Sequence, residues 1–388
     1  MADASIARNS TRPVHSVRLY YLDKLRVLLI SLIVLMHLAI TYGAPGGWYV
    51  NEVAFESLGL ASKILYTTYN ATVQAFALGL FFLLSGYFTA ASLERKGPRR
   101  FIRDRLMRLG LPLIVYTAVI NPVIVYLLYS RQERFFPFLF SHYTGLKFNM
   151  GPMWFVAELL IFTMIYLFWL TVKGSSAVKN SRESLTMPSN SRLFVLAFAS
   201  GVIAFAVRLV FPVGWSMPLV NFQLGYFTQY IVMFALGTAA WRLKWFERVS
   251  ECSPAPWLGC AALMMLIQPF PLILGSGGDL GSILGGVTWQ ALSYALWEPF
   301  VCLAMVIGLS TIFYRRLNGS GGWFEALPPN AYAVYVIHPA VMITLTSAFM
   351  DLVLPPLAKF AVMSPLVLTG CFGIAGLLRA IPGVKKVL

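Results

Sequence analysis

The chain consists of long apolar runs separated by shorter polar segments. Ten of these runs have the roughly 20 mainly apolar residues that an α-helix needs to cross a bilayer. Their side chains are apolar in every direction, whereas the strands of a transmembrane barrel alternate polar and apolar positions. We therefore predict an all-α polytopic membrane protein with ten transmembrane helices, at about 25–43, 71–92, 110–130, 153–172, 193–212, 222–241, 256–274, 288–313, 331–350 and 357–378.

The basic residues predict which side of the membrane each connection occupies. Lys and Arg are concentrated in alternate connections, at 93–109, 173–192, 242–255 and 314–330. The other connections are poor in cations, with 131–152 as a partial exception. Because cytoplasmic loops carry an excess of Lys and Arg, we expect the cation-rich connections and both termini to lie in the cytoplasm.

The same pattern predicts the domain organisation. We expect a cytoplasmic tail at 1–19, followed by a single transmembrane domain at 20–380. Within that domain, 173–192 is polar and rich in serine and has no apolar periodicity, so we interpret it as a cytoplasmic linker.

Composition supports a membrane protein and narrows its partners. Of the 388 residues, 58% are hydrophobic and only 12% are charged, about half the charged fraction of a soluble domain. A formal charge of +15 would suggest a nucleic-acid partner in a soluble protein. Here the cations flank membrane spans, so we expect membrane lipids and no nucleic acid as partners. The four cysteines lack the spacing of a metal or redox site, and we expect no metal.

The first apolar run carries an ionisable pair. His37 lies within the apolar sequence "VLLISLIVLMHLAI" (27–40), and Arg26 directly precedes it. Eleven helical steps bring the two residues to nearly one face of a helix, about 16 Å apart along its axis. An ionisable group at the depth of His37 is costly, so it usually faces a cavity or a partner. A neutral histidine bonded to a neighbouring helix is the alternative.

Four more ionisable residues are predicted at a similar depth, outward of or near the bilayer centre. They are Glu158, Arg208, Glu298 and His338. Clustered around a wet cavity, such groups are tolerable in a membrane and typical of a functional site. A structural ion pair of Arg208 with Glu158 or Glu298 is the competing interpretation.

A cationic cluster precedes the third span, in "RRFIRDRLMRLGLP" (99–112). Arg105 and Arg108 are three residues apart and therefore neighbours on one helix face. Together with Arg103, they could bind phosphates at a cytoplasmic mouth through charge-assisted hydrogen bonds. Ordinary anchoring to anionic lipid is the alternative. Before this cluster, "FFLLSGYF" (81–88) supplies small residues that favour close helix packing.

These motifs together resemble the acyltransferase-3 family of integral membrane proteins. Arg26 and His37 match its R-x10-H motif, and Arg105 to Arg108 matches its R-x-x-R motif. Three further stretches are similar and occur in the same order: "FFLLSGYF", "GPMWFVAELL" and "NAYAVYVIHPA". The resemblance covers about 20–375 and is greatest to the branch of the family that succinylates glucans.

The resemblance implies an enzyme, an O-acyltransferase with acyl-CoA as its cytoplasmic donor and no metal. It would move an acetyl or succinyl type of acyl group to a hydroxyl of a glycan or a small extracytoplasmic acceptor. It also implies a bacterial inner membrane location.

The candidate roles combine the resemblance with the chemistry of acyl transfer, which needs a base and groups that stabilise an oxyanion. His37 is the candidate base, with Glu158 or Glu298 as its support. The donor would be bound by Arg26, Arg103, Arg105 and Arg108, and the acceptor would contact Arg208, His338 and Trp154.

A transporter or exporter of a glycan or small molecule is the main alternative, because a central polar cluster also suits a transport path. A transporter would move its substrate without an acyl donor. An enzyme would consume donor and acceptor together.

Overall fold

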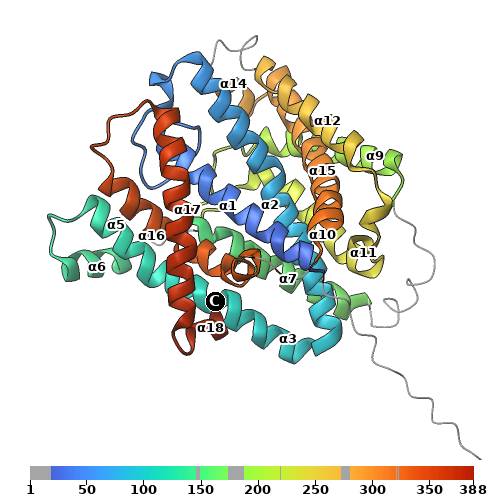
Figure 1. The fold of residues 1–388 in the computed structure, drawn as a ribbon, viewed down its shortest axis with the longest axis horizontal. Helices are drawn as coiled ribbons and strands as arrows, with labels where there is room; N and C mark the ends of the chain where they lie inside the picture. The colour runs from blue at the N-terminus through green and yellow to red at the C-terminus, as the bar shows by residue number, and fades with distance from the viewer. Residues whose placement is uncertain are drawn as a thin grey trace, which may run out of the picture.

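The computed structural model describes residues 19–145, 149–173, 188–218, 220–271, 280–319, 321 and 323–388. Regular secondary structure in these ranges is entirely helical, which confirms the all-α prediction (Figure 1). Eight helical stretches are long and apolar enough to cross a membrane, so the protein is integral to a membrane. These stretches are Tyr20–Thr41 (α1), Leu60–Lys96 (α2), Pro98–Tyr129 (α3 to α5), Gly151–Lys173 (ending in α7, Trp154–Lys173), Asn190–Arg208 (α9), Trp289–Leu317 (α15), Pro328–Ala348 (ending in α16, Ala331–Ala348) and Pro356–Ala380 (α17).

The two other predicted spans are helical but shorter. Helix α10 (Phe227–Arg242) has 16 residues, and helix α12 (Pro254–Ile267) has 14. The count of ten spanning helices and the cytoplasmic position of the termini therefore stay predictions. Most of the predicted linker and nearly all of the predicted tail lie outside the described residues. The remaining helices are short: α6 (Phe135–Thr144), α11 (Trp245–Arg248), α14 (Gly281–Leu284) and α18 (Val384–Val387).

Helix α2 is much longer than the predicted span, which began at residue 71. It has 37 residues, or about 55 Å at 1.5 Å per residue, against a hydrocarbon core of about 30 Å. Its first turns carry Lys63 and Asn70 among apolar residues, so a hydropathy pattern does not register them as part of a span. This extension helps to build the walls of the cavity described below.

The third span is continuous in direction but contains two π-helical turns, Leu106–Gly110 and Tyr116–Ile120. A proline lies two residues after the end of each turn, at Pro112 and Pro122. A proline has no N–H to donate, and its ring crowds the carbonyl four residues before it. The wider π turn relieves that crowding. π-helical turns are often found at functional sites, and the first one here directly follows Arg105.

Helix α2 forms the centre of the bundle, in contact with α1, α10 and α15 (Figure 1). Its approach to α10 depends on glycine. A Cβ atom on Gly86 would lie 2.2 Å from the Phe234 carbonyl oxygen, and one on Gly237 would lie 2.0 Å from that of Leu83. Gly86 of "FFLLSGYF" therefore has the predicted packing role.

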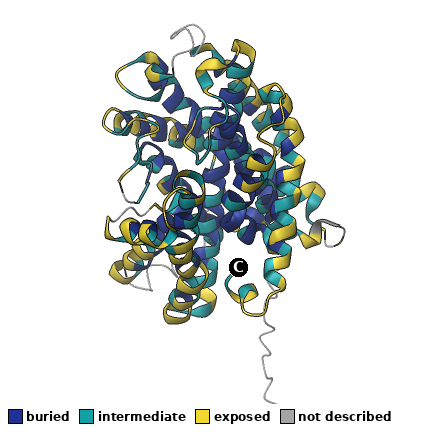
Figure 2. Ribbon diagram, turned by 90° about the vertical axis from the view of Figure 1, so that its left-hand side faces the viewer, coloured by how far each residue is buried: buried dark blue, intermediate teal, exposed yellow. Residues whose placement is uncertain are grey.

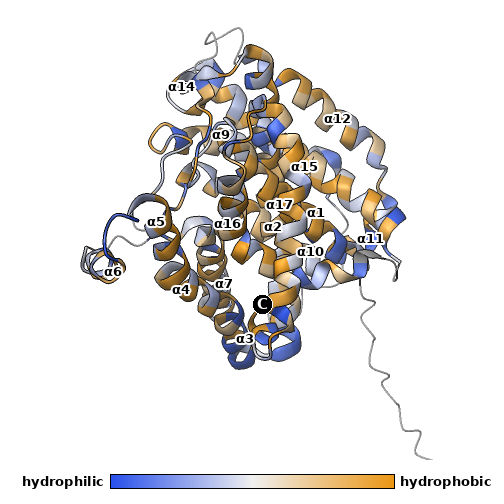
Figure 3. Cartoon of the chain, turned by 60° about the vertical axis from the view of Figure 1, so that its left-hand side comes forward, coloured by the Kyte–Doolittle hydropathy of each residue, from blue (hydrophilic) through white to orange (hydrophobic). Residues whose placement is uncertain are grey.

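The outward-facing surface of the helices is apolar. Buried residues gather in the middle of the bundle (Figure 2), while large apolar side chains are exposed on its outside, among them Phe168 and Val172 of α7 and Phe194 and Val195 of α9. Hydrophilic residues concentrate at the ends of the helices (Figure 3). An exposed apolar belt of this kind is what a bilayer requires of a polytopic protein.

Candidate active site

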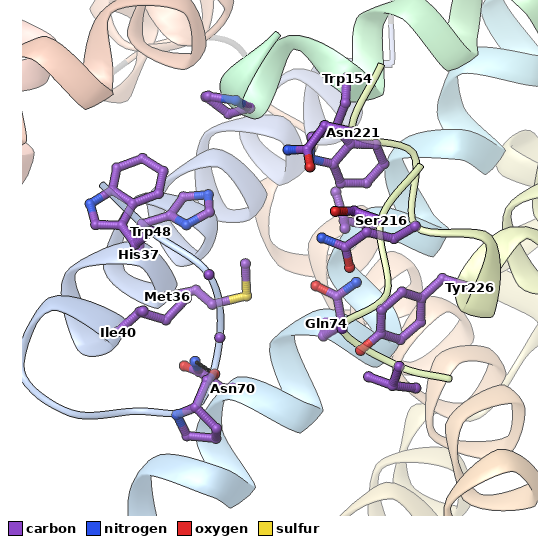
Figure 4. Close-up of a pocket in the computed structure, with 18 of the residues that line it drawn as sticks. Met36, His37, Ile40, Trp48, Asn70, Gln74, Trp154, Ser216, Asn221 and Tyr226 are labelled. Carbon is purple, nitrogen blue, oxygen red and sulfur yellow. Dashed lines mark hydrogen bonds between the residues drawn. The ribbon is translucent and has the colours of Figure 1, made fainter. Parts of the chain in front are cut away.

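The structure contains a cavity of about 760 Å³, and His37 lies in its wall. Helices α1 and α2 form one part of the wall. Much of the remainder comes from connections that the charge pattern predicts on the outer side, at 45–49, 149–152, 213–223 and 280. In Figure 4, His37 and Trp48 lie on one side of the cavity, opposite Trp154, Ser216, Asn221 and Tyr226. His37, which the sequence predicts to lie deep in the membrane, therefore faces an open cavity.

The cavity wall combines apolar side chains with many uncharged polar groups. Among the described residues that line it, there is no Asp, Glu, Lys or Arg. Its polar groups are mainly carboxamides and phenols, supplied by Asn70, Gln74, Asn121, Asn149, Asn221, Gln223, Gln268, Tyr49, Tyr129, Tyr226, Tyr294 and Tyr335. Carboxamides and phenols donate and accept hydrogen bonds without carrying charge, and aromatic rings offer flat apolar faces. Such a wall suits a neutral ligand with many hydroxyl groups.

His37 belongs to a cluster of three nearly parallel rings. Its imidazole stacks on the Trp48 indole, with ring centroids 3.9 Å apart and an interplanar angle of 17°. The His338 imidazole lies 5.4 Å from that of His37 and 5.7 Å from the indole. The Nδ1 atom of His37 is enclosed and has no hydrogen-bond partner among the described residues. The ring is otherwise partly exposed, so its Nε2 side meets the cavity.

His338 is fully buried behind the cavity wall. Its Nδ1 lies 2.7 Å from the backbone oxygen of Tyr335. A carbonyl oxygen only accepts, so Nδ1 carries the proton and Nε2 of a neutral ring keeps its lone pair. That Nε2 has no partner in the described part of the chain. His338 therefore contacts His37 and is not itself a cavity-lining residue. No group of three or more His, Cys, Asp or Glu in the described ranges is arranged to hold a metal.

Arg208 and Glu298 form a buried ion pair, with side chains only 2% and 3% exposed. Arg208 Nε also donates to the Gly225 carbonyl oxygen at 3.0 Å. Its guanidinium packs on the rings of Tyr226 and Tyr294, 5.2 Å from each centroid. The two tyrosines line the cavity, but the ion pair lies behind them. This geometry favours the interpretation of Arg208 and Glu298 as a structural ion pair over a direct role for Arg208 at the site.

Glu158 is also fully buried and does not line the cavity. Neither of its carboxylate oxygens has a hydrogen-bond partner among the described residues. It is close enough to act electrostatically on Tyr230 and Tyr335. The described residues include no hydrogen bond from His37 to Glu158 or Glu298. No hydrogen bond among the described residues therefore supports the prediction that one of these carboxylates orients His37.

The predicted donor-binding arginines gather at the other end of α1. Arg105 donates to Thr89 Oγ1 at 2.6 Å, and its guanidinium lies near those of Arg26 and Arg108. Arg26 stacks over Phe88 at 4.3 Å and pairs with Asp23 at 3.3 Å. The structure thus brings Arg26 of the R-x10-H motif together with the R-x-x-R motif at one end of α1, while His37 lies at the other end.

The periphery of this cluster is open. Arg103 and Arg108 are exposed, and neither Arg105 nor Arg108 forms an ion pair with an acid in the described ranges. These two arginines without a matching acid leave a net positive site that favours an anionic group.

Several cavity residues escaped the sequence analysis. Trp48 lies in a connection, where no periodicity marks it. Asn70 and Gln74 could have been found from the sequence, because they are polar, four residues apart and therefore on one face of α2. Of the predicted site residues, Trp154 and His37 line the cavity, and Trp154 also stacks near Tyr230, with ring centroids 6.0 Å apart.

Comparison with known proteins agrees with the motifs. The chain matches the acyltransferase-3 family, described as an acyltransferase domain, over residues 19–376. It is 25% identical over 344 residues to the protein named glucans biosynthesis protein C of Escherichia coli K12, which covers 84% of this chain and 82% of that relative. The protein of the same name from E. coli SMS-3-5 is 26% identical over the same lengths. No solved structure matches. The chain therefore belongs to the acyltransferase-3 family and is an acyltransferase of the membrane.

Proposed function

We propose that this protein moves an acetyl or succinyl group from acyl-CoA in the cytoplasm to a hydroxyl group of a glycan on the outer side of the bacterial inner membrane. The observation that carries the proposal is the position of His37. One end of α1 presents His37 to a neutral cavity, and the other end presents Arg26 to a cluster of arginines. An anionic donor and an uncharged acceptor would thus meet along one helix.

The cavity is the proposed acceptor site. Its aromatic and carboxamide wall matches the hydroxyl groups and apolar faces of sugars, and its volume falls within the usual range for ligand pockets. The names of the E. coli relatives refer to glucan synthesis, which makes a glucan the first acceptor to test.

The arginine cluster is the proposed donor site. Arg105 and Arg108, with Arg103 at the periphery, bind the phosphates of acyl-CoA, and Arg26 lies beside the entering thioester arm. Guanidinium groups bind phosphate through paired hydrogen bonds. The Arg105 contact with Thr89 fixes one guanidinium in place before the donor arrives.

His37 is the proposed general base. Its Nε2 accepts the proton of the acceptor hydroxyl while the hydroxyl oxygen bonds to the thioester carbonyl carbon. The carbon–sulfur bond then breaks, and the imidazolium returns the proton to the departing thiolate, leaving an ester and free CoA. General-base catalysis of this kind contributes about 10²- to 10⁴-fold to a rate.

The test is a transfer assay on purified protein in lipid nanodiscs. Radiolabelled acetyl-CoA or succinyl-CoA is supplied with neutral glucose oligomers, and both the acylated sugar and the free thiol are measured. We expect His37→Gln to lower the rate by at least about 100-fold, and His142→Gln, which changes a histidine outside the cavity wall, to preserve it. A folded His37→Gln protein that transfers at the wild-type rate would remove His37 from catalysis.

A further inference from the structure

The connection after α1 turns back over the helix it has just left. Gly43 and Gly46 have φ angles of +106° and +149°, values that L side chains rarely adopt. A Cβ atom on Gly46 would also lie 2.6 Å from Ile40 Cδ1. The chain can therefore reverse tightly at this point, and the reversal brings Trp48 onto the ring of His37.

Side-chain hydrogen bonds fix the connection on both sides of Trp48. Before it, Asn70 Nδ2 donates to the Pro45 carbonyl oxygen at 3.0 Å. After it, the Tyr129 hydroxyl donates to the backbone oxygen of Tyr49. The Tyr49 hydroxyl in turn donates to Asn121 Oδ1 at 2.5 Å. These partners come from α2 and α5 (Asn121–Tyr129), so two helices hold the backbone on either side of the indole.

A third helix holds the connection through an ion pair. Lys359 Nζ lies 2.5 Å from Glu52 Oε1, and it also donates to the Met350 carbonyl oxygen at 3.0 Å. The Lys359 side chain is 3% exposed and that of Glu52 is 19% exposed. Lys359 lies in the first turn of α17, where the helix dipole disfavours a cation. The Lys359 charge therefore does not stabilise α17. It is stabilised instead by Glu52, on the connection that carries Trp48.

His37 lacks the usual means of orienting a base. In acyl-transfer sites a carboxylate generally holds the imidazole through a hydrogen bond. Here Nδ1 of His37 has no such partner among the described residues. Ring stacking against Trp48 and His338 is what restricts the imidazole. Misplacing a reacting group by about 1 Å can cost about 100-fold in rate, so the rigidity of the Trp48 connection bears directly on His37.

We propose that Trp48 is the positioning residue of His37, and that the Glu52–Lys359 ion pair holds Trp48 in place. This inference rests on the proposed function, in which His37 is the base. Trp48 takes the part of an orienting carboxylate by covering one face of the imidazole, which leaves Nε2 directed at the acceptor. The ion pair acts at a distance, because it fixes the backbone four residues after the indole.

Two measurements test this inference, and the first does not need catalysis. The rate at which diethylpyrocarbonate modifies His37 is followed by peptide mass spectrometry. We expect Trp48→Leu to increase that rate several-fold, because the indole no longer covers the ring, and Trp48→Phe to increase it less. Glu52→Lys and Lys359→Glu are expected to act in the same direction, and the double exchange to restore most of the protection.

The second measurement is the acyl-transfer rate of the same variants. We expect kcat to fall about 10- to 100-fold in Trp48→Leu and in each single charge reversal, with donor KM unchanged and with recovery in the double exchange. Asp351→Lys reverses an exposed acid close to Met350 and is the matched control, with no expected effect. Glu52→Gln is a milder variant for use if a charge reversal does not fold.

The outcomes separate the two proposals. Unchanged His37 protection in Trp48→Leu, or increased modification with unchanged kcat, would overturn the positioning role. A double exchange that stays as impaired as the single reversals would overturn the role of the ion pair. Wild-type protein that forms no acylated product would refute the proposed function, while the modification rates would still decide whether Trp48 and the ion pair hold His37.

Discussion

Removal of one partner of the Arg208–Glu298 ion pair should destabilise the protein strongly, and removal of both should not. Arg208→Met leaves Glu298 in a site that is 3% exposed. Breaking a buried pair in this way costs about 3–5 kcal/mol. The Gly225 carbonyl also loses the Arg208 donor, and a buried unpaired acceptor adds about 1–3 kcal/mol.

The double variant Arg208→Met with Glu298→Leu removes the stranded charge. The Gly225 carbonyl then stays unpaired, at about 1–3 kcal/mol, while replacement of a buried ion pair by apolar residues can gain about 1–4 kcal/mol. The two contributions nearly cancel. We therefore expect the double variant to lie within about 2 kcal/mol of wild type and the coupling energy in a double-mutant cycle to reach about 3 kcal/mol or more.

The assay is the free energy of unfolding in mixed micelles, with acyl transfer measured on the same samples. A coupling energy below about 1 kcal/mol would refute the structural ion pair. A stable double variant that transfers acyl groups supports a purely structural role. A stable double variant without transfer would instead return Arg208 and Glu298 to the candidate acceptor and catalytic residues.

Three further predictions follow from the structure. Arg105→Ala should raise the donor KM about tenfold or more, the equivalent of about 1.4 kcal/mol for a lost charged hydrogen bond, whereas Arg99→Ala should not. A donor KM of Arg105→Ala equal to that of wild type would indicate that Arg105 only anchors the protein to lipid. Gly237→Ala should lower the thermal stability, because its Cβ would lie 2.0 Å from the Leu83 carbonyl oxygen, whereas Gly373→Ala in open space should not. Neutral glucose oligomers should be acylated faster than uronic-acid oligomers of equal length, because the described cavity wall has no cation to pair with a carboxylate; equal rates would contradict the cavity as the acceptor site.

Hydropathy predicted the positions of the helices well, because a spanning helix must be apolar over about 20 residues whatever it packs against. The same argument underestimated α2, whose 37 residues exceed the length that a bilayer core requires, so not all of its turns need to be apolar. It also interpreted 131–152 as a simple connection, although α6 lies within it. Where the bilayer does not dictate composition, a hydropathy pattern carries little information.

The sequence predicted how far along its helix each candidate residue lies, but not which way its side chain points around the helix axis. Sequence spacing gave the common face of Arg26 and His37, because both lie on one continuous helix. It could not tell whether Glu298 faced His37 or Arg208, since that depends on how separate helices are rotated against each other. Trp48 was beyond prediction for a different reason. Its place on His37 depends on hydrogen bonds from other helices and on an ion pair between Glu52 and Lys359, which are 307 positions apart along the chain.

Along helix α1, the proposed acceptor site is open to His37, whereas the proposed donor site is separated from it by packed side chains. Arg26, Ile30, Ile33 and His37 share one face of the helix, and Ile33 is the α1 residue of the cavity wall that lies farthest toward Arg26. An acceptor in the cavity therefore reaches the imidazole without passing Ile30. The direct path along this face, from the proposed donor site at Arg26 to the imidazole, passes Ile30, which is 2% exposed. Because Ile30 is packed against its neighbours, we infer that donor entry, and not acceptor entry, requires the helices around α1 to separate.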